Sequence, residues 1–295
     1  MKVLATGREG QLARSLVERA QAQHGIEMAA VGRPELDLQT PGGAARAINA
    51  IRPDVVINAA AYTAVDQAED EPELAMRINA DAAGEVAEAA AKLGVPVIQV
   101  STDYVFDGQG EGAYPEDAPT APLGVYGCTK LAGERQVRAR NPRHAIVRTA
   151  WVYSPFGRNF VKTIMAAAKV RSVLTVVEDQ RGNPTSALDL ADGLLAMLER
   201  WRVEPDFGLG KTYHLAGTGT TSWYGFAQAI MTECSRLGLP AARIEPIATA
   251  DWPTRVARPV NSQLSSVVFA EDFGFVMPPW EQSLTEVVGR LAQEG

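Results

Sequence analysis

The order of apolar and polar residues in this 295-residue sequence predicts an α/β protein with a doubly wound parallel sheet and a smaller C-terminal α/β lobe. In the first half, short β-rich runs alternate with alanine-rich stretches whose apolar residues recur at helical spacing. Such segments form βαβ units, in which parallel strands lie between helices on both faces of the sheet. Beyond about Trp151 the alternation becomes less regular, which indicates the separate lobe.

The elements of the first half can be placed from their apolar runs and turn residues. The longest expected helix is closed by Gly94 as a C-terminal cap. Strands are expected at 2–5, 28–31, 54–58, 97–100 and 145–148. Helices are expected from Leu12 onward and at 41–51, 73–93 and 123–140.

The second half is expected to contribute helices at 156–170, 189–201, 226–237 and 281–292, and strands at 174–177 and 212–216. At least one of these segments should return to the first sheet. We therefore predict a first domain over 1–153, with 183–201 and 211–217 joined to it. The remaining segments, 154–182 and 218–295, would form the lobe.

Composition and charge exclude several classes of protein. The net charge is −7 and no basic run occurs, so nucleic acid is not an expected partner. No apolar stretch approaches the ~20 residues of a membrane span. The first residues lead into a strand without a signal-peptide core, and Cys128 and Cys234 are too few for a disulfide framework, so we expect a cytoplasmic protein. The three histidines lack zinc-like spacing, so no metal is expected.

A glycine-containing turn follows the first strand and opens the first helix. Gly7 permits a tight turn, and Gly10 lets the backbone approach a pyrophosphate. The pyrophosphate would rest on the positive N-terminus of the helix, where Gln11 and Leu12 begin it. Ala13 replaces a third glycine and is still small. The alternative is an ordinary strand-to-helix turn, but its place in a βαβ unit favours a Rossmann-like dinucleotide site.

The end of the second strand indicates which dinucleotide binds. An acidic residue there would bind a ribose 2′-hydroxyl, but the sequence has Arg33, whose guanidinium suits a 2′-phosphate. We therefore expect NADPH, with NADH as the alternative. Asp37, with Leu38 beside it, is expected near the adenine. The alternative for Arg33 is an exposed loop arginine.

Three side chains from two segments are the catalytic candidates. Tyr126 and Lys130 are four residues apart on an expected helix and therefore point the same way. An ammonium near a phenol lowers the phenol pKa from ~10, which would let Tyr126 exchange a proton near neutral pH. Thr102 lies just past the carboxyl end of a buried strand, where its hydroxyl can donate to a substrate carbonyl. The alternatives are a surface helix pair and a strand-end cap.

Taken in order, these motifs resemble the extended short-chain dehydrogenases/reductases and, within them, the dTDP-4-dehydrorhamnose reductases. The resemblance covers nearly the whole chain, so it is more specific than a shared fold. Beyond the glycine turn it is carried by residues 58–66, 101–106, 126–130, 148–153, 159–160, 179–185, 220–224 and 258–262.

The resemblance implies a reaction: reduction of the 4-keto group of dTDP-4-dehydro-L-rhamnose to dTDP-L-rhamnose, with hydride from the nicotinamide. Tyr126 would protonate the developing alkoxide and Thr102 would orient the carbonyl. Lys130 would tune Tyr126 and hold the nicotinamide ribose. The first domain would then bind the cofactor and the lobe the substrate.

Further residues are assigned by their position in the family's motifs. The cofactor would be lined by Ala60, Ala61 and Tyr62. The sugar nucleotide would contact Asp103 and Trp151, with weaker candidates at Val65, Asp66, Asn159 and Arg258. The alternative for Trp151 is a core aromatic residue. Arg258 suits a pyrophosphate through its bidentate donors, and its alternative is a surface salt bridge.

The sequence departs from the family pattern at one feature. Some family members form a dimer bridged by magnesium through acidic residues, and the corresponding positions here are Ser15 and Leu188. We therefore expect no magnesium site, and either a monomer or a homodimer. Two other functions stay open: a different nucleotide-sugar reductase, epimerase or dehydratase on the same scaffold, and a non-catalytic regulatory subunit similar to the β subunit of methionine adenosyltransferase.

Overall fold

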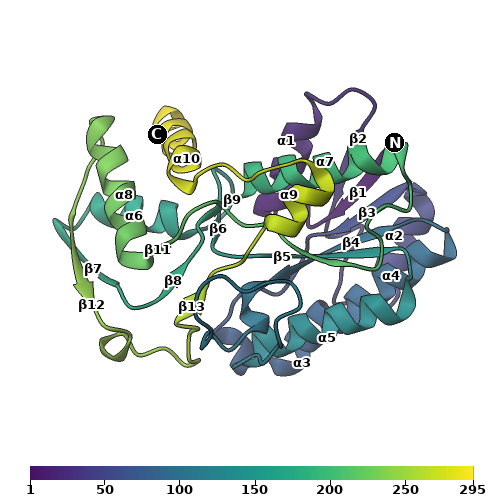
Figure 1. The fold of residues 1–295 in the computed structure, drawn as a ribbon, viewed down its shortest axis with the longest axis horizontal. Coiled ribbons are helices and arrows are strands. Elements are labelled where there is room, and N and C mark those ends of the chain that lie inside the picture. The colour runs from purple at the N-terminus through teal and green to yellow at the C-terminus, as the bar shows by residue number, and fades with distance from the viewer. Residues whose placement is uncertain (295) are drawn as a thin grey trace.

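Six parallel strands form the central sheet of the computed structural model, which describes residues 1–294 (Figure 1). Their bounds are β1 Lys2–Thr6, β2 Glu27–Val31, β3 Val55–Asn58, β4 Val97–Thr102, β5 His144–Thr149 and β10 Thr212–His214. They are ordered β10-β5-β4-β3-β1-β2, and every neighbouring pair is parallel. The winding direction reverses between β1 and β3, and ligands bind beside the carboxyl ends of strands at such a switch point.

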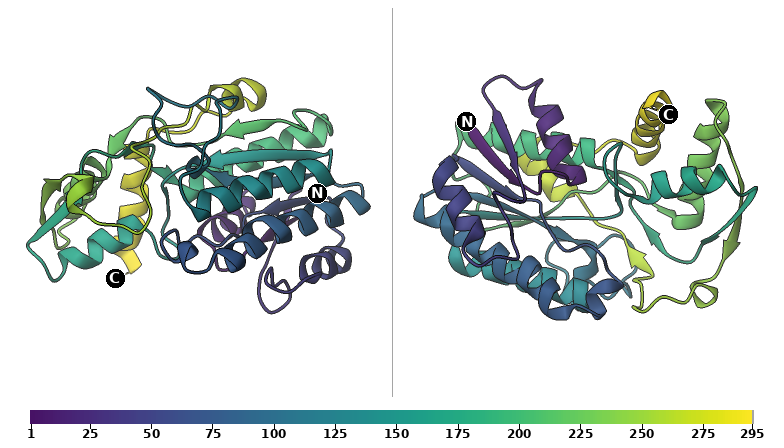
Figure 2. Two further views of the ribbon diagram at one scale, coloured as in Figure 1. Left: turned by 90° about the horizontal axis from the view of Figure 1, so that it is seen from below. Right: turned by 180° about the vertical axis from the view of Figure 1, so that it is seen from behind.

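Helices cover both faces of this sheet (Figure 1 and Figure 2). Their bounds are α1 Gln11–Ala20, α2 Gly43–Ile51, α4 Ala82–Lys92, α5 Val125–Arg140, α7 Ala187–Val203 and α9 Val267–Phe273. On one face α1 and α7 pack around Leu16 and Leu194, with Phe269 of α9 in the same core. On the other face α2, α4 and α5 enclose a core that includes Ile48 and Val86. The predicted doubly wound α/β fold is confirmed.

The helix expected over 73–93 is present as one helical run over 72–92, but it contains a π-helical turn that the sequence did not predict. It consists of α3 (Pro72–Met76), a π-helical segment η2 (Arg77–Asp81) and α4. Within η2, the Asn79 side chain accepts from the Tyr62 backbone N–H at 2.8 Å and donates to its carbonyl at 3.1 Å. The widened turn is therefore fastened to the loop that follows β3, and π-helical turns of this kind often occur at functional sites.

The lobe has its own core beside the sheet. Its larger elements are α6 Phe160–Ala168, β7 Val173–Val177, α8 Trp223–Arg236, β12 Arg243–Ile247 and α10 Trp280–Glu294. The helices pack around Phe226 and Val287, and β7 pairs in parallel with β12, a strand that the sequence did not indicate. Helix α6 begins later than its expected start at 156 because Asn159 caps it, accepting from the Lys162 N–H at 3.1 Å.

Short strands connect the lobe to the sheet. They are β6 Val152–Tyr153, β8 Arg181–Gly182, β9 Thr185–Ser186, β11 Thr221–Ser222 and β13 Asn261–Ser262. β8 pairs with both β11 and β13, and β6 pairs with β9. Single helical turns lie at η1 Gln67–Glu69, η3 Asp103–Val105 and η4 Thr249–Asp251. None of these two-residue strands was predicted, because their pairings join residues far apart in the sequence.

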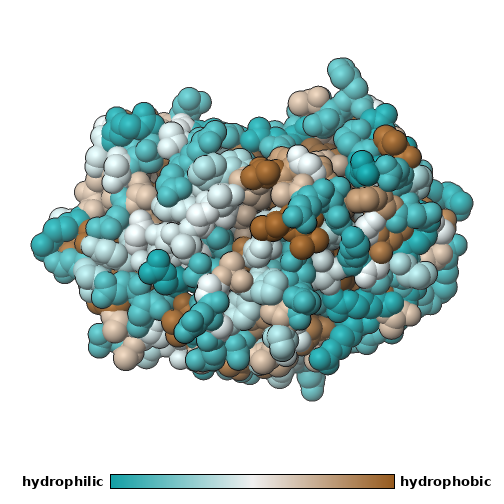
Figure 3. Space-filling view, in the orientation of Figure 1, coloured by the Kyte–Doolittle hydropathy of each residue, from teal (hydrophilic) through white to brown (hydrophobic). Residues whose placement is uncertain are grey.

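The face of the molecule drawn in Figure 3 is mainly hydrophilic, with hydrophobic residues in small, separate groups. Scattered apolar residues of this kind are usual on protein surfaces. Among the helices of residues 1–294, none combines the length and the apolar character that a membrane crossing requires.

Candidate active site

A cavity of about 820 Å³ opens at the carboxyl ends of the central strands. Its wall is formed by the turn after β1, the loops after β3, β4 and β5, and the first turns of α5. The expected site residues on this wall are Gly7, Gly10, Gln11, Leu12, Arg33, Ala60, Ala61, Val65, Thr102, Asp103, Tyr126, Lys130 and Trp151. The three catalytic candidates and the glycine turn, which lie in separate segments of the sequence, thus face one space.

A second hollow of about 510 Å³ adjoins the first beside the end of β2. It contains three further residues expected to contact the cofactor, Asp37, Leu38 and Tyr62. Both hollows are lined by Gly7, Gly32, Arg33, Ala60, Ala61 and Thr63. The combined space therefore extends from the Tyr126–Lys130 face to the tip of β2.

The glycine turn presents backbone donors to this space. Gly7 has a φ of +92°, and the Gly10 N–H donates to the Gly7 carbonyl at 2.7 Å, which closes the turn before α1. A Cβ at Gly7 would lie 3.2 Å from the Cβ of Ala60, so only glycine fits there without displacement. No side chain caps the N-terminus of α1. Its first N–H groups are therefore directed outward, as a pyrophosphate site requires.

Tyr126 lies on the wall of the main cavity and does not line the second hollow. Burial raises the pKa of the Tyr126 phenol well above its usual value, and a hydrogen bond with Thr102 partly opposes the increase. The edge of its ring also meets the Tyr104 ring, with the centroids 5.4 Å apart. Tyr126 is therefore a neutral phenol over the whole neutral pH range and holds a proton that it can donate.

Lys130 corrects one part of the sequence interpretation. Its Nζ donates to the carbonyl of Val100 on β4 at 2.7 Å, and burial lowers the pKa of the ammonium to about 8. The predicted lowering of the Tyr126 pKa by Lys130 is wrong for this state of the protein. The two residues share a face of α5, but the Lys130 ammonium donates to a backbone carbonyl. Desolvation is the largest influence on the pKa of the Tyr126 phenol and raises it.

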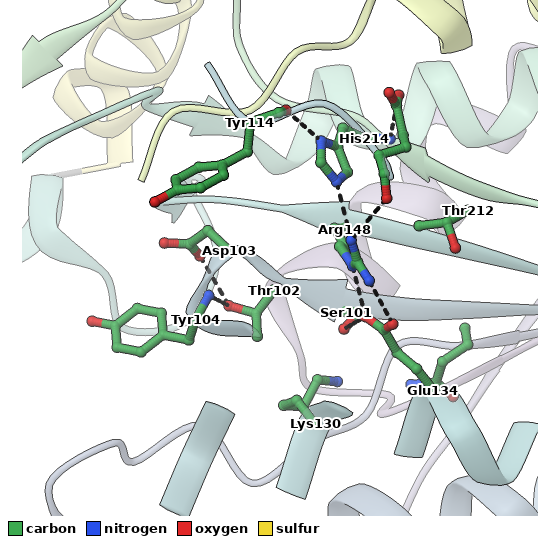
Figure 4. A network of polar contacts seen from close by, with 12 residues as sticks. Ser101, Thr102, Asp103, Tyr104, Tyr114, Lys130, Glu134, Arg148, Thr212 and His214 are labelled. Carbon is green, nitrogen blue, oxygen red and sulfur yellow. Dashed lines mark hydrogen bonds and ion pairs between the residues drawn. The ribbon is translucent and has the colours of Figure 1, made fainter. Parts of the chain in front are cut away.

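A buried charged network lies one helical turn beyond Lys130 (Figure 4). Arg148 of β5 donates to both oxygens of Glu134, through Nε and Nη2, each at 2.9 Å. The Ser101 hydroxyl donates to the same carboxylate at 2.7 Å. Figure 4 shows Arg148 between this carboxylate and His214, whose imidazole is neutral because burial lowers its pKa to about 3. The network fixes α5 to both β4 and β5 directly beneath the cavity.

The sequence interpretation missed this network, although a signal was present. Glu134 repeats the four-residue spacing of Tyr126 and Lys130, which places all three on one face of α5. Arg148 stands opposite Ser101 in the register of β4 and β5. An acid at helical spacing and an arginine inside an otherwise apolar strand indicate a buried pair, but only the fold shows that they meet.

Asp103 is a further titrating group on the cavity wall, besides Tyr126 and Lys130. Burial raises the pKa of its carboxyl to about 6, against the hydrogen bonds that it accepts. The Thr102 hydroxyl donates to Asp103 Oδ1 at 2.9 Å and accepts from the Tyr104 N–H at 3.2 Å. Among the described residues, Asp103 Oδ2 and the hydroxyl of Thr149 are buried without a hydrogen-bond partner. Unpaired buried polar atoms on a cavity wall are suited to polar groups of a ligand.

Trp151 lies where the sheet meets the lobe. Its φ of +48° is rare for a residue with a large side chain. The indole stacks on Trp223 of α8, with centroids 3.6 Å apart and planes 10° from parallel. On another side it approaches Gly182, where a Cβ would lie 2.6 Å from Trp151 Cε2. Trp151 therefore both packs as a core aromatic and forms part of the cavity wall.

Three expected substrate residues do not line the cavity. Asp66 and Arg258 form an ion pair at 2.5 Å, and Arg258 also donates to the Tyr104 hydroxyl at 3.3 Å. Asn159 caps α6 and donates to Gln11 at 3.0 Å. In this conformation Arg258, Asn159 and one oxygen of Asp66 are paired within the protein, whereas Asp66 Oδ1 is buried without a hydrogen-bond partner. Wall residues that the sequence interpretation did not name include Arg8, Glu9, Thr63, Thr149 and Arg158.

The positions considered for magnesium are both buried. The Ser15 hydroxyl donates to the Gln11 carbonyl at 2.9 Å, and Leu188 is part of the apolar core of the lobe. Within residues 1–294, no three His, Cys, Asp or Glu side chains are grouped so that they could hold a metal ion.

Comparison with known proteins identifies the family. The model described as the RmlD substrate binding domain matches residues 1–293. The dTDP-4-dehydrorhamnose reductase of Sinorhizobium fredii is 41% identical over 295 residues, which span 100% of this chain and 99% of that protein. The Escherichia coli K12 enzyme of the same name is 42% identical over 257 residues, 86% of this chain and 85% of that protein. The chain belongs to the dTDP-4-dehydrorhamnose reductase family.

Solved structures of dTDP-4-dehydrorhamnose reductases agree with this membership. The Clostridium acetobutylicum structure is 37% identical with a TM-score of 0.89, and the match covers 99% of both chains. The Bacillus anthracis structure, in complex with NADP, is 34% identical with a TM-score of 0.88 and covers 98% of this chain and 99% of that one. A UDP-glucose 4-epimerase from Thermus thermophilus, at 19% identity and a TM-score of 0.80, shares the fold alone. The resemblance stated from the sequence motifs is confirmed.

Proposed function

We propose that this protein is an NADPH-dependent oxidoreductase that reduces the 4-keto group of dTDP-4-dehydro-L-rhamnose to give dTDP-L-rhamnose. Relatives with this reaction in their name match over the full length of the chain. The observation that carries the proposal is the meeting of Thr102, Tyr126 and Lys130 on the wall of the cavity that begins at the glycine turn.

The residues around the cavity fit a dinucleotide. Its pyrophosphate would lie on the uncapped N-terminus of α1, beside Gly7 and Gly10. Ala60, Ala61 and Tyr62 would line it along the loop after β3. At the far end Arg33 would bind the 2′-phosphate, with Asp37 and Leu38 near the adenine. When bound, NADPH supplies the hydride, and NADH is the alternative donor.

The protein's own part in the reaction is to orient the carbonyl and to supply a proton. The Thr102 hydroxyl, now donating to Asp103, would turn to the substrate oxygen and fix its direction. Tyr126 would give its proton to that oxygen as negative charge develops on it. Lys130, released from Val100, would hold the nicotinamide ribose and favour the phenolate that remains.

The substrate would occupy the side of the cavity that faces the lobe. Asp103, Trp151 and Val65 line the main cavity, and we propose them as contacts to the sugar nucleotide. Asp66, Asn159 and Arg258 would join them only if their present pairings open. Residues 1–153, with 183–201 and 211–217, would then bind the cofactor. Residues 154–182 and 218–295 would bind the substrate.

The proposal is tested by following NADPH oxidation and identifying the product after incubation with the 4-keto sugar nucleotide. We expect one NADPH consumed for each dTDP-L-rhamnose formed. Tyr126→Phe should lower kcat by about 100-fold or more because the proton donor is lost, with NADPH binding retained. An epimerase or dehydratase would turn the sugar over without net NADPH oxidation, and a regulatory subunit would give no turnover.

Location and assembly complete the proposal. Cys128 and Cys234 are both free thiols, which supports a reducing, cytoplasmic location. We propose a monomer or a homodimer that acts without magnesium. Unchanged activity after exhaustive treatment with a chelator is the expected result.

A further inference from the structure

Arg8 and Glu35 form an ion pair between the glycine turn and the loop after β2. Arg8 Nη2 lies 2.7 Å from Glu35 Oε2, and both side chains are substantially exposed. Arg8 lines the main cavity, and Arg33, two residues before Glu35, lines both hollows. No part of the proposed reaction uses Arg8 or Glu35.

The backbone holds Arg8 against the end of β2. The Gly7 N–H donates to the carbonyl of Val31, the last residue of that strand, at 2.8 Å. A Cβ at Gly32 would lie 3.1 Å from the Arg8 nitrogen and 3.2 Å from its Cβ. Arg8 is therefore fixed beside the strand end where Rossmann-type folds distinguish a ribose 2′-hydroxyl from a 2′-phosphate.

The charged side chains in and beside the loop after β2 are two arginines, Arg8 and Arg33, and two carboxylates, Glu35 and Asp37, of which Glu35 is the partner of Arg8. A hydrogen bond to its own backbone, and then the bond from Arg8, lower the pKa of Glu35, so it is ionised at neutral pH. A phosphate monoester carries roughly 1.5 to 2 negative charges at pH 7 and binds arginine bidentately. Such a phosphate would compete with Glu35 for Arg8 and would be repelled by the carboxylate.

We propose that Arg8 is a ligand for the 2′-phosphate of NADPH and that Glu35 competes for it, which reduces the preference for NADPH over NADH. The inference rests on the proposed placement of the dinucleotide along the glycine turn. With NADPH, Arg8 leaves Glu35 for the phosphate. With NADH, the pair stays closed and the Glu35 carboxylate accepts from the ribose 2′-hydroxyl.

The test measures direct binding of NADPH and of NADH to the purified protein by fluorescence titration, without sugar nucleotide. Glu35→Gln should tighten NADPH binding by about threefold to fivefold, the range of an exposed ion pair, and should not tighten NADH. Arg8→Met should weaken NADPH about tenfold and change NADH by less than about twofold.

A matched control separates this local effect from a change of net charge. Glu88 pairs with Lys92 on α4 at 2.5 Å, is also exposed, and does not line either hollow. Glu88→Gln removes the same charge and should leave both affinities unchanged. Melting temperatures of all variants should match the wild type because the altered side chains are exposed.

Each result decides the inference. Equal weakening of NADPH and NADH in Arg8→Met would assign Arg8 to the shared pyrophosphate and overturn it. Unchanged or weaker NADPH binding in Glu35→Gln would also overturn the inference. A wild type that binds neither nucleotide would overturn it too, and would also reject the proposed cofactor site. The expected shifts support the inference even if the 4-keto sugar is not reduced, an outcome that would reject the proposed reaction alone.

Discussion

The two ends of the cavity are held by different kinds of interaction. At the end where we propose that the nucleotide binds (the nucleotide end), the backbone turn from Gly7 to Gly10 lies beside the exposed ion pair Arg8–Glu35. At the other end, where we propose that the reaction takes place (the reacting end), Lys130, Glu134 and Arg148 are each at most 4% exposed. Arg148 pairs with Glu134, and Lys130 donates to a backbone carbonyl. Solvent screens the Arg8–Glu35 pair, so we expect changes to this pair to alter nucleotide affinity only by small steps. Because Lys130, Glu134 and Arg148 are buried, we expect changes to them to have large effects on the free energy of unfolding and on the proposed proton transfer.

The largest expected effect comes from breaking the buried pair. Glu134→Ala should lower the free energy of unfolding by about 3 to 5 kcal/mol, because Arg148 is left as an uncompensated buried charge. Urea unfolding measures the loss. Replacing both partners, Glu134→Leu with Arg148→Met, should recover most of it. A loss under about 1 kcal/mol for Glu134→Ala would show that the reacting end does not depend on burial as described.

The glycine turn should be the most sensitive part of the nucleotide end. Gly7→Ala places a Cβ 3.2 Å from Ala60 at a φ of +92°, so we expect about 1 to 3 kcal/mol of destabilisation, with weaker binding of both nucleotides. Gly94→Ala is the matched control, since its φ is +73° but a Cβ there meets nothing within 4 Å. Gly94→Ala should lower the free energy of unfolding without changing nucleotide affinity. Equal nucleotide affinity for the two variants would contradict the close approach at Gly7.

Lys130 should give activity and stability opposite dependences on pH. Its pKa is lowered from 10.5 to about 8 by burial. Because the proposed reaction needs the Lys130 ammonium, kcat/KM should fall about tenfold per pH unit above 8. The folded state disfavours the protonated form, so this destabilisation is fully present below pH 8 and disappears as pH rises toward 10.5.

Lys130→Met provides the stability reference for that dependence. The stability of the wild type relative to this variant should increase from pH 8 to pH 10.5, as measured by urea unfolding across the range. A constant difference would mean that Lys130 is not desolvated in the folded protein.

The smallest expected effect is at an exposed pair remote from the cavity. Lys92→Met breaks the Glu88 pair on α4, whose side chains are 71% and 48% exposed, and should change the free energy of unfolding by less than about 0.5 kcal/mol. Its kcat/KM should equal that of the wild type. A larger change in the free energy of unfolding would show that the exposed fraction of the side chains alone does not distinguish weak surface pairs from strong buried ones.

Local sequence patterns were enough to predict the sheet strands and most helices. Apolar runs such as 97–100 and 145–148 are bounded by turn residues, and their burial is complete or nearly so in the fold. Thr102 was found from its position at the end of a predicted strand, and Tyr126 and Lys130 from their four-residue spacing. Both features can be recognised in the sequence alone. Their roles in the reaction stay predictions.

Other features depend on contacts that no local pattern records. In the π-helical turn, the Asn79 side chain is hydrogen-bonded to the Tyr62 backbone. Strand β8 forms through its pairing with residues 221–222 and 261–262. The pKa direction of Tyr126 was wrong because spacing gives the direction of a side chain but not the extent of its burial. Glu134 and Arg148 meet through the register of β4 and β5, which only the folded sheet defines.

The position of β10 has a consequence for how the chain is made. This strand pairs with β5 at the edge of the central sheet, although the segments that begin the lobe are translated between them. During synthesis the edge of β5 stays open until residue 214 has left the ribosome, and an unpaired strand edge invites association with other chains. Late translation of 212–214 therefore leaves the growing polypeptide with an open strand edge after the other five strands of the central sheet have been made.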